Sequence, residues 1–278
     1  MRTLRSYSKL INEIINLKIP LKVEIVDYIT YDKIFPFIIM SRISKLASEN
    51  VVMVSGHHGD EYYAVHVLLK WIQQVKLENY PDFNFIIAPI INPFGYETGS
   101  RSNGNRKDTN TSKNFYKNSD VKELAILYDN LPADITLYLD IHGDTEKQGV
   151  YAYERKPDDS LSLARPALLE NDVLLPYEKT NSIYRDKVEG GVITTYGDKD
   201  VGLEGVLENI GAHYTIAFEL PGKVHGQKRM SGGVAIINSI LTHLLKQIKK
   251  EEEGETKTNG TKNGTGSNNE NPGDSPGL

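Results

Sequence analysis

Short, almost wholly apolar segments alternate with helical patterns, and this alternation constrains the fold more than any other feature. Buried β-strands are predicted over residues 50–56, 85–91 and 135–141, where β-branched and other apolar residues run together. Residues 61–75 and 121–131 carry the periodicity of helices with one apolar face. Strands that are apolar on both faces and separated by helices are typical of a parallel sheet covered on both sides. We therefore predict a single α/β domain with a mostly parallel, mixed central sheet flanked by helices.

The ends of the domain are also visible. A first helix is expected within residues 1–18, a further strand over residues 213–220 and a closing amphipathic helix over residues 233–249. Residues 95–120 and 143–212 are rich in Gly, Asn, Asp and Lys and have little periodicity, so we expect loops there. In such folds, the loops that leave the carboxyl ends of the strands build the site.

The chain changes character after Lys250. From Glu251 onward it contains no aromatic residue and almost no aliphatic one, so burial cannot offset the entropy lost on ordering. We predict a folded catalytic domain over residues 1–250 and a disordered, low-complexity tail over residues 251–278.

Composition excludes several classes of protein. The formal charge is −5, and Lys and Arg do not cluster, so nucleic acid is not expected as a partner. No apolar run approaches the roughly 18 residues that a membrane span needs, so no membrane partner is expected either. The N-terminus has no continuous apolar core of a signal peptide, and the chain has no cysteine. A cytoplasmic protein is therefore expected, with any metal held by His and carboxylate side chains; the oligomeric state stays open.

The first candidate site is Gly56-His57-His58-Gly59-Asp60-Glu61, where a strand ends and a helix begins. A His and a Glu three residues apart at a helix start project from the same side and can share one cation. The alternative is a helix N-terminus whose acidic residues are favoured by the helix dipole.

The second candidate is His142, which the apolar strand Leu139-Asp140-Ile141 delivers at its carboxyl end. Together with His58 and Glu61 it would complete a His, Glu, His set and leave one coordination position open, as a catalytic zinc site requires. The alternative is a buried histidine hydrogen-bonded to a neighbouring strand.

The third candidate is Glu219, a carboxylate within the otherwise apolar strand Tyr214–Leu220. An unpaired buried carboxylate is costly, so we expect a function or a partner for it. Beside a metal-bound water it would serve as general base and then pass the proton to the leaving amine. The alternative is a glutamate at a strand end that points into solvent.

The order of these motifs resembles the carboxypeptidase A-like zinc carboxypeptidase family, which is related to the succinylglutamate desuccinylase and aspartoacylase branch. The likeness covers roughly residues 50–222 and rests on the His58/Glu61 motif, on Asp140-Ile141-His142 and on Phe218-Glu219-Leu220. It implies one Zn²⁺ per chain, bound by His58, Glu61 and His142, with Glu219 as the catalytic glutamate. His57 is the nearest rival ligand.

Further positions follow from the resemblance. Asn92-Pro93-Phe94-Gly95-Tyr96 resembles a turn of the family, and Arg101 stands at the offset of its oxyanion-stabilising arginine, with Arg106 as the alternative carrier.

Substrate-binding positions come from the same comparison. Asn110 matches an asparagine that grips the terminal carboxylate of the substrate, but Thr111 stands where the family has arginine, and Lys113 is a possible replacement cation. Tyr196, 23 residues before Glu219, is close to the spacing of the family's mobile tyrosine.

The resemblance implies a zinc-dependent peptidase that cleaves a C-terminal peptide or isopeptide amide bond in a small peptide. One alternative is an N-acyl amino acid deacylase of the aspartoacylase and succinylglutamate desuccinylase type, acting on an acylated amino acid. Another, of a different class, is a catalytically silent relative that binds peptides. The replaced arginine at Thr111 leaves the choice between exopeptidase, amidase and deacylase open.

Overall fold

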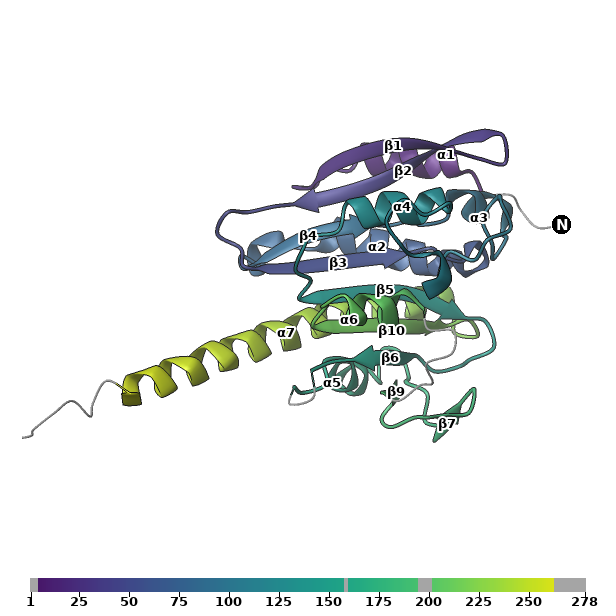
Figure 1. The fold of residues 1–278 in the computed structure, drawn as a ribbon. Helices are drawn as coiled ribbons and strands as arrows, with labels where there is room; N and C mark the ends of the chain where they lie inside the picture. Colours follow the sequence, from purple (N-terminus) through teal and green to yellow (C-terminus); the bar gives the residue numbers. More distant parts are fainter. Residues whose placement is uncertain (1–4, 158–159, 195–201, 263–278) are drawn as a thin grey trace, which may run out of the picture.

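The central feature of the fold is a mixed β-sheet. The computed structural model of the chain describes residues 5–157, 160–194 and 202–262, with residues 252–262 described as backbone. Within these ranges the main sheet has eight strands in the order β1-β2-β4-β3-β5-β10-β6-β9 (Figure 1). Their bounds are β1 Lys22–Thr30, β2 Lys33–Arg42, β3 Glu49–Ser55, β4 Phe83–Ala88, β5 Leu137–Asp144, β6 Tyr151–Arg155, β9 Val192–Ile193 and β10 Tyr214–Pro221.

The middle of the sheet is parallel. Strands β4, β3, β5 and β10 run parallel to one another. On either side of this group, β2 pairs with β4 and β6 pairs with β10 in antiparallel fashion. Every residue of β4 and β5 is buried, as expected for strands covered on both faces. The predicted α/β class with a mostly parallel, mixed sheet is confirmed.

Helices cover both faces of the sheet (Figure 1). Helices α2 (Tyr62–Gln74), α5 (Ala164–Glu170) and α7 (Gly226–Lys262) pack together on one face. Helices α4 (Lys122–Asp129) and α6 (Leu203–Asn209) lie on the other, and α1 (Tyr7–Ile15) and α3 (Pro93–Thr98) pack near β2. Short 3-10 turns occupy Gly59–Glu61, Leu77–Asn79 and Ser112–Asn114.

Trp71 links two of the helices on the first face. Its ring is fully buried, and its Nε1 donates a hydrogen bond of 2.9 Å to Asn238 Oδ1 on α7. An indole buried with its polar atom satisfied contributes a large apolar contact without a desolvation penalty. The amphipathic patterns of α2 and α7 are therefore explained by their mutual packing over the sheet.

Two parts of the architecture differ from the sequence prediction. Residues 22–42 form the antiparallel hairpin β1–β2, which was not predicted. The segment 143–212 was expected to consist of loops, but it contains β6, α5 and α6, the two-residue strand β9 and the small hairpin β7–β8 (Ser182–Ile183 and Asp186–Lys187). Strands of two to five residues and helices of seven are too short to show a period in the sequence.

The predicted domain boundary at residue 250 falls inside α7. The helix expected over residues 233–249 begins at Gly226 and continues to Lys262, beyond residue 250. The disordered tail over residues 251–278 stays a prediction. Glu and Lys are good helix formers, and a helix that is already nucleated can continue beyond its packed portion. Residues 263–278, the rest of the predicted tail, lie outside the described residues.

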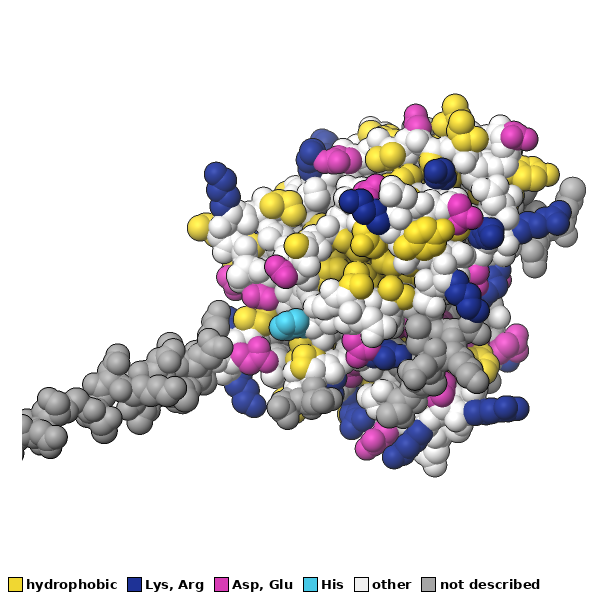
Figure 2. Space-filling model, viewed as in Figure 1, with side chains coloured by type: hydrophobic (Ala, Val, Ile, Leu, Met, Phe, Trp, Pro, Cys, Tyr) yellow, Lys and Arg dark blue, Asp and Glu magenta, His cyan; other side chains and the backbone are white. Residues whose placement is uncertain are grey.

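Figure 2 shows a group of hydrophobic side chains near the middle of one face of the molecule. In Figure 2, Lys and Arg side chains are scattered among Asp and Glu over the face that is shown. No helix in the described part of the chain combines the length and the apolarity needed to cross a membrane.

Candidate functional site

The candidate residues meet at one edge of the sheet because three neighbouring parallel strands end there. His57 and His58 follow β3, and His142 lies near the end of β5. Glu219 of β10 is paired in register with His142, so the two residues stand side by side on adjacent strands. Carboxyl ends of parallel strands are the usual location of sites in open α/β sheets.

Gly59 lets the His58–Glu61 loop pass close to α3. Its amide donates to the carbonyl of Ser100 at 2.9 Å, and a Cβ at this position would lie 1.9 Å from the carbonyl carbon and oxygen of Gly95. Any side chain would therefore push the loop away from α3.

Asn92 holds the same loop from the other side. Its side chain is fully buried, and its Nδ2 donates to the carbonyls of His57 at 3.1 Å and Arg101 at 3.2 Å. Its Oδ1 accepts from the amide of Gly95 at 2.8 Å and so caps α3. The predicted Asn-Pro turn therefore connects the backbone at His57 with the backbone at Arg101.

Glu61 links the two histidines predicted as ligands. Its Oε1 lies 2.7 Å from His58 Nδ1, and its Oε2 lies 3.0 Å from His142 Nδ1. All three side chains are buried, and one donor atom from each lies within 4.8 Å of the others. A buried His, Glu, His cluster of this spacing suits a metal ion.

Carboxylates hold the remaining nitrogens of both rings. His58 Nε2 lies 3.2 Å from Asp108 Oδ1, and His142 Nε2 lies 3.1 Å from Asp140 Oδ2. Metal-binding histidines almost always donate their second nitrogen to such a partner, which fixes the ring orientation and the tautomer. This arrangement leaves Nδ1 of each ring as the atom available to a cation, so the residues fit a metal centre.

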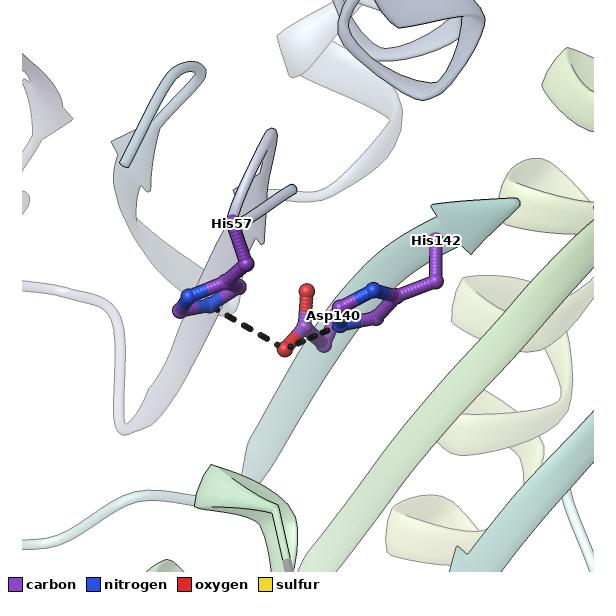
Figure 3. A group of neighbouring side chains, drawn as sticks. All are labelled: His57, Asp140 and His142. Atoms are coloured by element: carbon purple, nitrogen blue, oxygen red, sulfur yellow. Dashed lines mark ion pairs between the residues drawn. The ribbon is translucent and has the colours of Figure 1, made fainter. Parts of the chain in front are cut away.

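His57, the rival ligand, belongs to a different group (Figure 3). It is fully buried, its Nε2 lies 3.3 Å from Asp140 Oδ2, and its ring stacks on that of His142 with centroids 5.5 Å apart. His57, Asp140 and His142 are a second set of neighbouring potential ligands. Both sets share His142, whose two nitrogens face Glu61 and Asp140.

The hydrogen bonds within the cluster favour a negatively charged Glu61 and a positively charged His142. Burial alone would raise the pKa of Glu61, but hydrogen bonds from His142 and His58 hold it well below its usual range. Burial alone would lower the pKa of His142, but the Asp140 carboxylate raises it well above the usual value. A cation at this position would replace the protons on the rings as the partner of Glu61.

The pKa of Glu219 is shifted upward, in the opposite direction to that of Glu61. Burial raises its pKa to about 8, and the neighbouring Glu61 adds to the rise, while His142 opposes it. A carboxyl group that titrates near neutrality suits proton transfer. A divalent cation beside Glu61 would lower this pKa again, because it favours the charged carboxylate.

These groups open into a cavity of about 640 Å³. Its described lining includes His58, Glu61, Arg101, Asn110, His142, Asp144, Tyr151, Tyr184, Glu204 and Glu219.

Two residues predicted for substrate contact lie in this cavity. Arg101 NH1 is 3.4 Å from Glu61 Oε1, so the guanidinium stands beside the candidate metal centre. Asn110 Nδ2 lies 3.1 Å from His142 Nε2, and its Oδ1 accepts from the amide of Leu203 at 2.9 Å. The structure thus brings both residues to the site, and Asn110 also ties α6 to it.

The other predicted residues are not brought there. Arg106 and Lys113 are exposed and are not among the described residues that line the cavity. Arg106 has a φ of 59°, at a turn that carries its side chain outward. Tyr196 lies outside the described residues.

Sequence reasoning missed a group around Asp144. Asp144 Oδ2 accepts hydrogen bonds from Tyr151 at 3.0 Å and from Tyr184 at 2.7 Å. Tyr184 lies in the turn between β7 and β8, and no sequence signal connects it with the site. Asp144 could have been found, because it stands two residues after His142 on the same strand and therefore on the same face.

The family of the chain places it among hydrolases of the desuccinylase and aspartoacylase type. A family model described as "Succinylglutamate desuccinylase/Aspartoacylase catalytic domain" matches residues 47–244, and the chain belongs to this family. The predicted relationship to the zinc carboxypeptidases and to this branch is confirmed. No match was found among curated proteins.

Solved structures support the fold. A candidate metallopeptidase from Shewanella amazonensis superimposes with a TM-score of 0.70 at 22% identity, covering 86% of this chain and 91% of that one. A metallo-carboxypeptidase from Burkholderia cenocepacia gives 0.63 at 16% identity, covering 86% and 68%. A succinylglutamate desuccinylase/aspartoacylase from Rhodobacter sphaeroides gives 0.58 at 16% identity, covering 81% and 64%.

The first prediction concerns Asn92. Asn92→Ala removes three hydrogen bonds, including the cap on the buried amide of Gly95, so we expect a loss of about 2–4 kcal/mol in the free energy of unfolding. Chemical denaturation measures this loss. Asn12→Ala, an exposed change on α1, is the control and should alter stability by less than about 0.5 kcal/mol. An Asn92 variant as stable as this control would contradict the proposed clamp.

The second prediction concerns pH. Hydrogen bonds to Asp108 and Glu61 raise the pKa of His58 despite its burial, and that of His142 is raised further, so metal must displace protons from both rings. Metal affinity should therefore rise with pH, by about tenfold per pH unit for each proton released. Calorimetry in buffers of different ionisation enthalpy counts these protons. Binding without proton release, or equally tight at pH 6 and pH 8, would contradict the prediction.

Proposed function

We propose that this chain is a zinc-dependent hydrolase that cleaves an amide bond at the end of a small peptide, either a C-terminal peptide bond or an isopeptide bond. The observation that carries the proposal is the position of Glu219 beside His142, in register on adjacent strands and facing the same cavity as His58 and Glu61. A metal cluster with a carboxylate base at its side is what hydrolysis of an unactivated amide needs.

The proposed cofactor is one Zn²⁺ per chain, held by His58, Glu61 and His142. Zinc with three protein ligands polarises carbonyl oxygens and lowers the pKa of water to about 7. The nitrogen and carboxylate donors suit this ion, since the chain has no cysteine. Asp108 and Asp140 keep the two imidazoles oriented for it.

Glu219 acts as the general base in this proposal. It accepts a proton from the attacking water in the cavity and returns it to the nitrogen of the leaving amine, which departs neutral. Arg101 stabilises the negative charge that develops on the carbonyl oxygen, because its guanidinium stands next to Glu61 and remains partly exposed to the cavity. Asn110, through its contacts with His142 and Leu203, shapes the wall on which the substrate lies.

A second candidate function is deacylation of an N-acyl amino acid. The family match over residues 47–244 favours it, since the model describes a desuccinylase and aspartoacylase catalytic domain. The same residues would act in the same way, because both reactions are hydrolyses of an amide. The two candidates differ in the substrate that fits the cavity.

The decisive experiment measures zinc by elemental analysis and then assays release of free amino acid from two substrate sets. One set contains small peptides, and the other contains N-acetyl and N-succinyl amino acids, each with and without a chelator. Chelator-sensitive release from peptides supports the first proposal, and release from the acylated amino acids alone supports the second. A protein without stoichiometric metal would contradict both.

The third prediction separates the base from the ligands. Glu219→Gln keeps the shape of the side chain but cannot take a proton, so it should retain metal and lose about 10²–10⁴-fold in kcat. His142→Ala should lose the metal itself, to well below one ion per chain. Glu189→Gln, an exposed change, is the control for both measurements. A Glu219→Gln variant with wild-type turnover would show that another group is the base.

A further inference from the structure

Arg5, just before α1, reaches the turn that carries two of the candidate metal ligands. Its NH1 donates hydrogen bonds to the carbonyl of Gly59 at 2.6 Å and to the carbonyl of Tyr96 at 3.1 Å. Gly59 stands between His58 and Glu61 in the sequence, and Tyr96 belongs to α3. One guanidinium nitrogen therefore joins the turn to α3, from a position 54 residues before Gly59 in the chain.

The same guanidinium also covers the residue that follows Glu61. The Cζ atom of Arg5 lies 3.9 Å from the ring centroid of Tyr62 and 5.7 Å from that of Tyr96. A cation over an aromatic face at this range adds attraction to the hydrogen bonds. Arg5 therefore contacts the backbone before Glu61 and the side chain after it, so it restrains the turn on both sides of a candidate ligand.

Both polar backbone groups of Gly59 have partners outside the turn. The amide donates to the carbonyl of Ser100 at 2.9 Å, and the carbonyl accepts from Arg5. These two bonds fix the peptide planes on either side of Gly59, and with them the direction in which Glu61 leaves the turn. The Glu61 carboxylate must reach two histidines at once, over distances of 2.7 and 3.0 Å. A small rotation of the turn would therefore lengthen at least one of these contacts.

The packing of α1 fixes where the Arg5 side chain begins, because Arg5 directly precedes the residue that caps this helix. The hydroxyl of Tyr7 on α1 donates to the carbonyl of Pro36 on β2 at 2.6 Å. The buried residues of the helix are Tyr7, Leu10, Ile11 and Ile14. The family model begins at residue 47, so this restraint comes from a part of the chain that the family match does not include.

We propose that Arg5 is a positioning residue for the candidate metal centre. By holding the carbonyl of Gly59 and the ring of Tyr62, it keeps Glu61 in the orientation that binds a metal ion together with the two histidines. Arg5 is not among the described residues that line the cavity, so it acts through the turn and not on the substrate. The inference rests on the proposed function, since the ion concerned is the proposed Zn²⁺.

The zinc affinity of Arg5→Ala tests the inference. The folded variant should bind Zn²⁺ about 10–100-fold more weakly than the wild type, the usual loss when a group that orients a metal ligand is removed. Competition with a chromophoric chelator measures this affinity, at a temperature at which circular dichroism shows both proteins to be folded. Unchanged zinc affinity would overturn the proposal, because a residue needed only for stability lowers the free energy of unfolding and leaves the affinity of the folded protein as it was.

Further variants show whether the contact itself is responsible. Arg5→Lys keeps a charged nitrogen that can donate to both carbonyls, so it should recover most of the affinity. Lys9→Ala removes an exposed cation from α1 and should leave the affinity unchanged. If Arg5→Ala does not fold, Arg5→Gln, which is shorter and neutral, takes its place with the same expectation. A loss in Lys9→Ala equal to that in the Arg5 variant would overturn the proposal, since general charge would then explain both.

Amide hydrogen exchange in the metal-free protein separates this inference from the proposed function. The amides of Gly59 and Glu61 donate to the carbonyls of Ser100 and His58, and both should exchange about tenfold faster in Arg5→Ala. Faster exchange in a protein that binds no zinc would contradict the proposed function and support the role of Arg5 in positioning Glu61. Unchanged exchange and unchanged zinc affinity would refute that role and leave the proposed function intact.

Discussion

The carboxylate of Glu61 is the interaction on which the rest of the site depends. It lies between two histidines and accepts the amide of Gly143 at 3.0 Å, so it joins the loop after β3 to the end of β5. A carboxylate this deeply buried needs positive charge beside it, whether protons on the two rings or a metal ion. The features around it serve this arrangement. Gly59 allows the close approach to α3, Asn92 fixes the loop, and Asp108 and Asp140 keep the ring nitrogens turned toward Glu61.

Much of the fold and of the site could be predicted from the sequence, because the central strands are apolar on both faces and end in ionisable residues. His142 and Glu219 interrupt β5 and β10 at matching positions, and their pairing follows from the register of parallel neighbours. The hairpin β1–β2 was missed because β1 is an edge strand that is largely exposed and therefore does not read as an apolar run. The elements between residues 143 and 212 were missed because their segments are short and form through contacts with distant parts of the chain. Glu204 and Tyr184 were missed for the same reason. Arg106 and Lys113 were proposed from the family resemblance as alternatives, and both lie outside the described lining of the cavity.

The sequence alone did not show which of the two adjacent histidines, His57 or His58, faces Glu61. Successive side chains of an extended segment point in opposite directions, and His58 has an extended backbone at φ −106° and ψ 121°. His58 therefore faces Glu61, while His57 is directed into the sheet against Asp140. Asp140 then faces two imidazoles, which lower its pKa even though burial alone would raise it. The outcome is a buried negative charge behind His142. This charge makes the ring a stronger electron-pair donor to a metal ion.

The charges of the cavity constrain how a substrate can lie in it. Arg101 is drawn to Glu61 and to Asp108, at 3.4 and 3.8 Å, so its positive charge is held at the wall next to the candidate metal centre. The carbonyl oxygen of a scissile amide, or a terminal carboxylate, finds compensation at that wall. Glu204 projects from α6 beside Gly202 and Asn110, on a wall built by a different segment. Asp60, Asp144, Glu146 and Asp186 bring further carboxylates to the described lining, so an anionic group of a substrate is compensated beside Arg101 and repelled elsewhere in the cavity.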